Sequence, residues 1–361
     1  MQHNGAIVLA MFGTTVDAGL RGLLAVRDAV ARTWPHTPVH LAFTSNRIRA
    51  TWRKRAVDPQ WRLDHADIPA DILHVQGPLA VLASLQDQGH NRVVVQPVHM
   101  VPAEEFHDLA ALVRGLAAIR SMQPHTRPFA TLALGRPALG GCDPRHPASA
   151  DIRRVAVALA ADADQARREG AALVYMAHGS RHFPVGGLYL EFAACMRELY
   201  PDLLTLIGTV DGFPPLDTVV AELHGHGAER VLLKPLLIAS GMHAARDLAG
   251  PGADSWQSRL TAAGFTTVID SAGLGEKPAF AHVFVEHIAE AAATAGLEIA
   301  CCARPPPPPC GCRWPGCSCS ASASRPRSAS STSPSRTWSP SSGPGSPASP
   351  CPRVSTRWPP P

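Results

Sequence analysis

Three short apolar segments of this chain occur twice, and the second copies follow the same order as the first. Ile7–Thr14 (IVLAMFGT) corresponds to Leu173–Ser180 (LVYMAHGS), and Val93–Pro97 (VVVQP) corresponds to Val231–Pro235 (VLLKP). Further on, Leu134–Leu139 (LGRPAL) corresponds to Leu274–Phe280 (LGEKPAF). Matches that keep one order indicate an internal duplication, so we expect the two halves to share one fold.

Within each copy, continuous Val/Ile/Leu runs alternate with longer amphipathic stretches, a pattern typical of βαβ units and parallel sheets. We expect strands at 6–12, 38–44, 71–75, 92–97, 129–134, 172–177, 204–210, 230–237 and 266–271. We expect helices at 17–33, 78–88, 104–121, 152–169, 185–199, 215–226, 254–263 and 278–296. The predicted fold is therefore α/β, with two similar Rossmann-like domains that are related by duplication and separated by a cleft. We place these domains at 1–145 and 146–299.

The remaining segment, 300–361, has a different composition. It is rich in Pro, Ser, Arg and Cys, includes five consecutive prolines from Pro305 to Pro309, and contains no acidic residue. Such a segment cannot bury enough apolar surface to offset its ordering entropy, so we expect it to be disordered. A shifted reading frame is one origin that would explain the abrupt change.

The charge and cysteine content of residues 1–300 restrict the partners and the compartment. These residues carry 26 basic and 29 acidic side chains, a balance of −3 that argues against nucleic acid as a partner. Their only cysteines, Cys142 and Cys195, give no disulfide framework and favour a reducing compartment. We see neither a signal peptide nor an apolar run of about 20 residues. We therefore expect a cytoplasmic protein without a membrane partner, and homo-oligomerisation stays open.

Polar residues follow several of the predicted strands, where parallel sheets bind their ligands. In the second half these residues are His178 and Asp211, each directly after a predicted strand, and His243, six residues after the end of the strand at 230–237. Two imidazoles and a carboxylate at one edge of a sheet suit a borderline divalent ion such as Co²⁺, Ni²⁺, Fe²⁺ or Zn²⁺. His182 lies in a Pro- and Gly-containing loop, and His224 and His226 lie near a helix end, so we set these three aside as ligands.

Six motifs together resemble the class II tetrapyrrole chelatases, and among them the anaerobic sirohydrochlorin cobaltochelatases of cobalamin synthesis. The resemblance covers about residues 5–298. The motifs are Ala10–Thr15, Phe43–Ser45, Gln96–His99 with Glu104 and Glu105, Ala177–Ser180, Val210–Pro214, and Gly241–His243. The resemblance implies two chelatase-type domains with a cobalt site in the second.

The same resemblance assigns roles to individual residues. It implies His178, Asp211 and His243 as metal ligands, although the family usually has Glu where this chain has the shorter Asp211. It implies His178, Glu104 and Glu105 as catalytic residues, because metal insertion expels two pyrrole protons that a base must accept. Residues that we expect to contact the polycarboxylate ring are Phe12, Gly13, Thr14, Arg47, His99, Gly179, Ser180 and Arg181.

These expectations lead to insertion of Co²⁺ into sirohydrochlorin, with the metal as a substrate. No nucleotide is expected, because the chain has neither a Gly-x-Gly-x-x-Gly turn after the first strand nor a Walker A sequence. Fe²⁺ or Ni²⁺ as the metal stays open, as does an iron chelatase that acts on sirohydrochlorin or a porphyrin. A non-catalytic metal or tetrapyrrole carrier and a two-lobed binding protein for a small anion also stay open. Glu104 and Glu105 facing the metal site would favour catalysis over transport.

Overall fold

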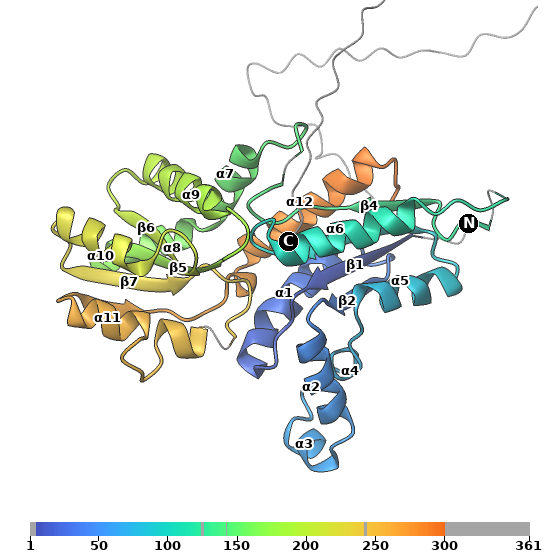
Figure 1. Ribbon diagram of the computed structural model, residues 1–361, viewed down its shortest axis with the longest axis horizontal. Coiled ribbons are helices and arrows are strands. Elements are labelled where there is room, and N and C mark those ends of the chain that lie inside the picture. The colour runs from blue at the N-terminus through green and yellow to red at the C-terminus, as the bar shows by residue number, and fades with distance from the viewer. Residues whose placement is uncertain (1–4, 124–125, 142, 242–243, 300–361) are drawn as a thin grey trace, which may run out of the picture. The chain divides into compact units, whose positions relative to one another are not determined.

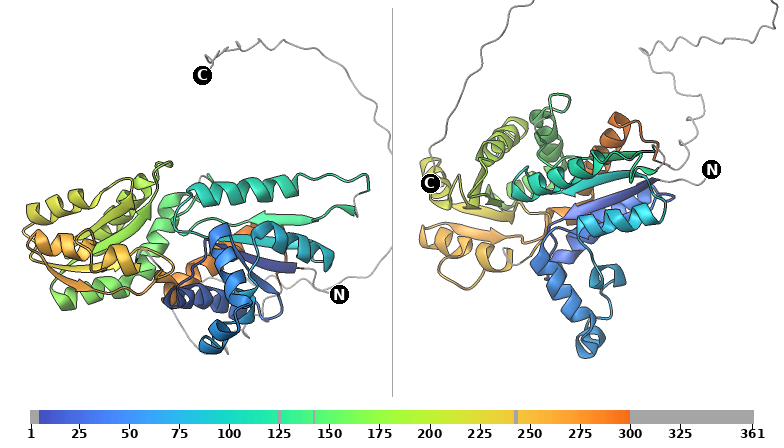
Figure 2. Two further views of the ribbon diagram at one scale, coloured as in Figure 1. Left: turned by 60° about the horizontal axis from the view of Figure 1, so that its bottom comes forward. Right: turned by 45° about the vertical axis from the view of Figure 1, so that its right-hand side comes forward.

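Two parallel sheets of four strands each organise the chain (Figures 1 and 2). The structure is a computed structural model that describes residues 5–123, 126–141, 143–241 and 244–299. The first sheet contains β1 Gly5–Met11, β2 Val39–Phe43, β3 Arg92–Val98 and β4 Thr131–Leu134. The second contains β5 Ala172–Gly179, β6 Thr205–Asp211, β7 Arg230–Pro235 and β8 Thr266–Ile269.

Both sheets have the same topology. Their strand orders are β2-β1-β3-β4 and β6-β5-β7-β8, and all neighbouring strands are parallel. The registers correspond as well, since Met11 pairs with Phe43 in the first sheet and Ala177 pairs with Thr209 in the second. The duplicated α/β fold expected from the repeat is therefore confirmed.

Helices cover both faces of each sheet (Figure 2). Those before the middle of the chain are α1 Asp17–Thr33, α2 Asn46–Ala56, α3 Pro59–Asp64, α4 Ala70–Leu73, α5 Pro78–Asp87 and α6 Glu104–Ala117. Those after it are α7 Ala148–Ala158, α8 Ala160–Glu169, α9 Gly186–Leu199, α10 Leu216–Gly225, α11 Trp256–Ala262 and α12 Pro278–Thr294. Two short helical turns complete this half, η2 Ala244–Leu248 and η3 Leu274–Glu276.

The continuous apolar strands are explained by this two-sided cover. In β1, Ile7 and Leu9 belong to a core shared with α1 and α12, whereas Ala6 and Val8 pack with α5 and α6. Successive side chains of a strand point to opposite faces, so a sheet with helices on both faces needs apolar residues at every position.

The last helix of the chain, α12, packs against the first half. α7 follows the first sheet but lies against α9, and α12 follows the second sheet but lies against α1 and β3. The chain therefore crosses between the halves twice, and one apolar core extends through both. The proposed domain boundary at 145/146 stays a prediction from the sequence.

A buried polar network joins these crossing helices. Arg136, which follows β4, donates to Asp151 of α7 with Nε–Oδ2 and Nη2–Oδ1 distances of 2.6 and 2.8 Å. His287 of α12 is fully buried, and its Nε2 lies 3.1 Å from Asp151 Oδ1. Glu290 of α12 pairs with both Arg136 and Arg154. Burial tends to raise the pKa of Asp151, but the bonds from Arg136 and His287 lower it to about 2.

The structure corrects three expectations about local elements. The predicted strand at 71–75 is instead the end of α4, which packs on α2, because a short apolar run does not distinguish a buried strand from a buried helical turn. The predicted helix at 152–169 is two helices, α7 and α8, that meet at Leu159. Finally, α2 and α3 form where no helix was expected, and Ser45 and Asp58 cap their N-termini.

Some residues that carry sequence-based predictions lie outside the described part of the chain. These are Cys142, His243 and the tail at 300–361, so the expected disorder of the tail stays a prediction. Among the described residues, no helix has the length and hydropathy required to cross a bilayer.

Candidate functional site

A cleft of about 1120 Å³ lies at the carboxyl ends of the strands and is lined by residues of both halves. From the first half it contains the predicted Phe12, Gly13, Thr14, Arg47, His99, Glu104 and Glu105. From the second half it contains the predicted His178, Gly179, Ser180, Arg181 and Asp211. All predicted site residues that the structure describes therefore line one cavity, and His243 is outside the described residues.

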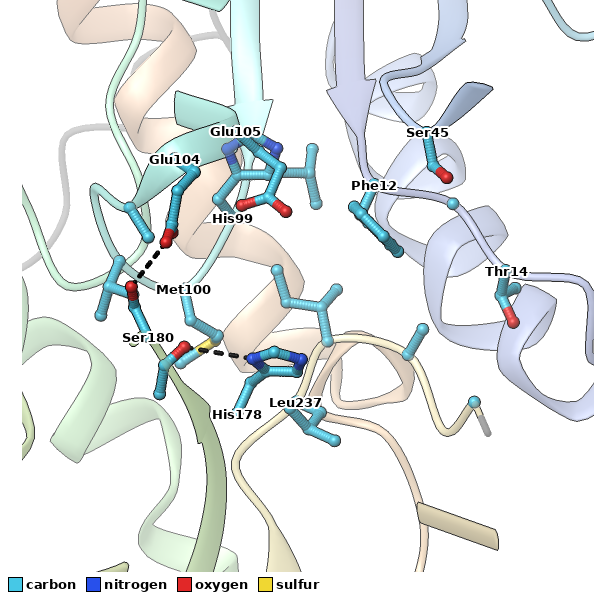
Figure 3. Close-up of a pocket in the computed structure, with 18 of the residues that line it drawn as sticks. Phe12, Thr14, Ser45, His99, Met100, Glu104, Glu105, His178, Ser180 and Leu237 are labelled. Atoms are coloured by element: carbon cyan, nitrogen blue, oxygen red, sulfur yellow. Dashed lines mark hydrogen bonds between the residues drawn. The ribbon is translucent and has the colours of Figure 1, made fainter. Parts of the chain in front are cut away.

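His178 and Asp211 stand at the ends of adjacent strands. Gly179 of β5 pairs with Asp211 of β6, which brings the imidazole and the carboxylate to the same edge of the sheet. The His178 side chain is exposed in the cleft, and its Nδ1 lies 3.1 Å from the carbonyl oxygen of Gly179 (Figure 3). A proton donated from Nδ1 to this carbonyl leaves Nε2 as the nitrogen with a lone pair for a metal ion or a proton.

Gly179 has a backbone conformation that the site requires. Its φ is +77°, and a Cβ at this position would lie 1.7 Å from the carbonyl oxygen of Asp211. Only glycine adopts this conformation at such close approach without strain. The sharp turn that follows sets the position of Ser180, whose hydroxyl oxygen accepts the N–H groups of His182 and Phe183.

Ser180 also connects the two halves across the cleft. Its hydroxyl donates to Glu104 Oε1 at 2.8 Å, as the upper dashed line in Figure 3 shows. Burial tends to raise the pKa of Glu104, but its own backbone N–H, the Ser180 hydroxyl and the nearby His182 and His178 together lower it. Glu104 is therefore an ionised carboxylate at neutral pH.

Glu105, the next residue of α6, also lines the cleft, but its side-chain contacts differ from those of Glu104. Its carboxylate makes no hydrogen bond or ion pair with any described residue, although it is half-buried. Acidic residues in the first turn of a helix often serve only to stabilise that helix. Here the first turn of α6 opens into the cavity that contains His178, so both carboxylates are available to a ligand there.

His99 is a deeply buried residue of the cleft wall. It is 9% exposed, and neither ring nitrogen has a hydrogen-bond partner among the described residues. Burial lowers the pKa of His99 to about 4, so the ring is neutral at physiological pH. A buried imidazole with unmade hydrogen bonds is costly for folding, which is consistent with a role in the site.

The arginines of the cleft differ in their partners. Arg181 pairs with Asp211 and Arg246 pairs with Asp247, whereas Arg47 is exposed and forms no ion pair with a described residue. Arg49 donates to the backbone carbonyl oxygens of Phe43 and Thr44. Arg47 is thus the first-half arginine that can meet a carboxylate of a ligand.

Thr14 has local contacts that the sequence did not predict. Its Oγ1 accepts the N–H of Val16, and its carbonyl oxygen accepts the indole N–H of the fully buried Trp52 at 2.8 Å. These contacts hold the loop that carries Phe12, which is 49% exposed although it is aromatic. Phe12 occupies the repeat position that corresponds to His178, so an apolar ring and an imidazole come from equivalent strand ends.

The sequence interpretation missed the apolar part of the cleft wall. Met100, Val101, Leu237 and Ile238 line the cavity together with the polar residues, as Figure 3 shows for Met100 and Leu237. Each lies in an apolar run directly after β3 or β7, and such runs are indistinguishable from core residues in a sequence. Their combination with a few polar groups is typical of a pocket for an organic ligand.

Comparison with known proteins identifies the family. The family model described as "Cobalt chelatase (CbiK)" matches residues 5–293. The chain belongs to this cobalt chelatase family. The tetrapyrrole chelatase resemblance expected from the six motifs is thereby confirmed.

Two curated relatives and one solved structure support the same relationship. The chain is 31% identical over 285 residues to "Sirohydrochlorin cobaltochelatase CbiKC" of Nitratidesulfovibrio vulgaris, covering 79% of this chain and 89% of that protein. It is 27% identical to "Sirohydrochlorin cobaltochelatase" of Salmonella typhimurium, covering 79% and 96%. The solved structure of SirB from Bacillus subtilis with Fe³⁺ superposes with a TM-score of 0.53 at 16% identity, covering 81% and 97%, which shows a shared fold.

Proposed function

We propose that this chain is a chelatase that inserts Co²⁺ into sirohydrochlorin without a nucleotide. The observation that carries the proposal is the single cleft in which His178 and Asp211 of the second half share a cavity with Glu104 and Glu105 of the first. The cofactor-free chemistry of metal insertion needs these two kinds of group together: ligands that hold the ion and bases that accept protons. Both curated relatives are named for this activity.

The metal ion would approach from the second half. His178 and Asp211, at adjacent strand ends, together with His243 from the sequence, provide two imidazoles and a carboxylate for a borderline ion. Within the described residues, no three His, Cys, Asp or Glu side chains form a metal-binding group. His243 lies outside the described residues, so the complete ligand set stays a prediction.

Proton removal would use the first half. Glu104 is ionised and is held by Ser180, so it can accept a proton and return it to solvent. Glu105 faces the same cavity without a partner among the described residues and is a second acceptor. We assign His178 a double role, as a ligand and as the base nearest the ion.

The ring would occupy the cleft between these groups. The volume of the cleft, about 1120 Å³, is slightly above the usual range of small-molecule sites, about 300–1,000 Å³, and suits a macrocycle better than a small anion. Phe12 and Leu237 offer apolar surface to the ring face, while Arg47 offers a cation to its carboxylates. Gly13, Gly179 and His99 line the same cavity and are further candidates for contact.

A non-catalytic carrier is less well supported, because a carrier needs no proton acceptor beside its metal site. A chelatase that prefers Fe²⁺ or Ni²⁺ to Co²⁺ can be distinguished by comparing the insertion rates of the three ions. A cytoplasmic location and a homo-oligomeric state remain predictions.

The test is anaerobic mixing of the protein with sirohydrochlorin and Co²⁺, Fe²⁺ or Ni²⁺, followed through the absorbance of the ring. We expect protein-dependent insertion that is fastest with Co²⁺ and that falls by at least about 100-fold in His178→Ala, the range for loss of a general base. Glu104→Gln and Glu105→Gln should each lower kcat more than they raise KM.

Matched controls separate chemistry from folding. His282→Ala on α12 and Glu222→Gln on α10 change exposed side chains outside the cleft and should leave the rate unchanged. Binding of the ring or the metal without acceleration over the protein-free rate would replace the chelatase by the carrier.

A further inference from the structure

Arg181 and Asp211 form an ion pair inside the cleft. Arg181 Nε and Nη2 lie 2.8 and 2.6 Å from the same oxygen, Asp211 Oδ1. The arginine side chain is 73% exposed, whereas that of Asp211 is 26% exposed. The cation therefore covers one oxygen of the carboxylate from the solvent side.

Stability does not account for this pair. Exposed ion pairs contribute about 0–1 kcal/mol, since solvent screens the charges and the long side chain loses entropy. The tight turn at Gly179 already fixes the end of β5 against the backbone of Asp211 through their strand pairing. A contact that adds little to folding, between two groups that both line the cavity, is better explained by its effect on a ligand.

The pair has a direct electrostatic effect on any cation that approaches Asp211. A guanidinium on Oδ1 neutralises much of the carboxylate charge and repels a dication nearby. One unit charge about 6 Å from a dication changes its affinity about tenfold even at the dielectric constant of water. Asp211 is the only acidic residue among the described second-half residues that line the cleft, so no other carboxylate of this half offsets the repulsion.

We propose that Arg181 is a positioning residue that holds the Asp211 carboxylate and lowers the affinity of this carboxylate for the incoming divalent ion. The inference rests on the proposed function, because a chelatase must release its metal to the ring whereas a storage site need not. A loosely held ion moves to the macrocycle, and the Arg181 charge sets how loosely it is held. Removal of the charge should therefore tighten metal binding and slow the transfer.

The test measures binding of Co²⁺ alone to the full chain by anaerobic isothermal titration calorimetry. We expect Arg181→Ala to bind Co²⁺ about tenfold more tightly than the wild type. Arg181→Lys keeps the charge and should stay within about threefold of the wild type. Asp211→Asn should weaken binding, and adding Arg181→Ala to it should have little further effect, because asparagine no longer holds the exposed guanidinium beside the ion.

Arg259→Ala is the matched control, since Arg259 forms an exposed ion pair with Asp217 in the same half and does not line the cleft. It should leave the Co²⁺ affinity unchanged. Equal or weaker binding by Arg181→Ala, or tightening that persists with Asp211→Asn, would overturn the inference while leaving the chelatase intact. Wild-type protein that binds Co²⁺ but never inserts it would instead overturn the proposed function. In that case, tenfold tighter Co²⁺ binding by Arg181→Ala would still support the role of Arg181 in metal affinity. A wild type that binds no Co²⁺ overturns both.

Discussion

Replacement of Asp151 by asparagine should strongly destabilise the protein, although Asp151 lies outside the cleft. Its side chain is 1% exposed and contacts Arg136, Arg154 and His287, which join the loop after β4 to α7 and α12. A carboxyl whose pKa falls from 3.8 to about 2 contributes about 2.5 kcal/mol at neutral pH. Asparagine also leaves the two guanidinium partners under-compensated, so we expect a total loss of about 3–4 kcal/mol.

Urea denaturation followed by far-UV circular dichroism measures this loss, which corresponds to a midpoint lower by about 1 M or more. Asp202→Asn is the control, because the Arg167–Asp202 pair is exposed and should contribute less than about 1 kcal/mol. The pH dependence has a defined sign. The folded-state pKa of Asp151 is depressed, so its contribution is full above about pH 4 and is lost as the pH falls toward 2. A loss of stability at neutral pH no larger than that of Asp202→Asn would show that the buried Asp151 network does not stabilise the fold.

Three further changes test other parts of the structure. Gly179→Ala should abolish Co²⁺ binding and destabilise the fold, because its Cβ would meet the Asp211 carbonyl oxygen at 1.7 Å; Gly187→Ala, with open space around its Cβ, should do neither. Between about pH 6.5 and 4 the unfolded wild-type chain binds a proton at His99 that the buried ring does not bind, so the folded state loses up to about 3 kcal/mol of stability. His99→Leu should remove this loss, which thermal denaturation at each pH measures. Deletion of 301–361 should leave melting temperature and metal insertion unchanged, and a fall of several degrees would contradict the predicted disorder.

The sequence predicted the sheets well because their signal is local. Apolar runs such as Val93–Val95 and Leu232–Leu233 are long enough, and flanked clearly enough, to mark buried parallel strands. The same rule misassigned 71–75, where the apolar side chains of Ile72 and Leu73 face the core from a helical turn. In both cases the apolar side chains correctly predict a buried segment. Whether that segment is a strand or a helical turn depends on the elements that pack against it.

The candidate site was predictable for a related reason. Parallel strands of one sheet all end at the same edge, so residues directly after strands, such as His178 and Asp211, had to come together whatever the details of packing. Glu104 could be expected near them only from the family resemblance, because it comes from the other half. Its hydrogen bond to Ser180 depends on how the two halves meet.

The duplication, the two sheets and the strand ends that carry the chemistry could all be predicted from the amino-acid sequence, since each follows from periodicity and order along the chain. The packing of helices on the sheets required the three-dimensional structure, because α12 of the second half lies against α1 and β3 of the first. The three-dimensional structure alone revealed that Arg181 binds Asp211 and that His99 is buried without partners among the described residues. These features arise from contacts between segments far apart in the sequence, and a local sequence pattern cannot predict such contacts.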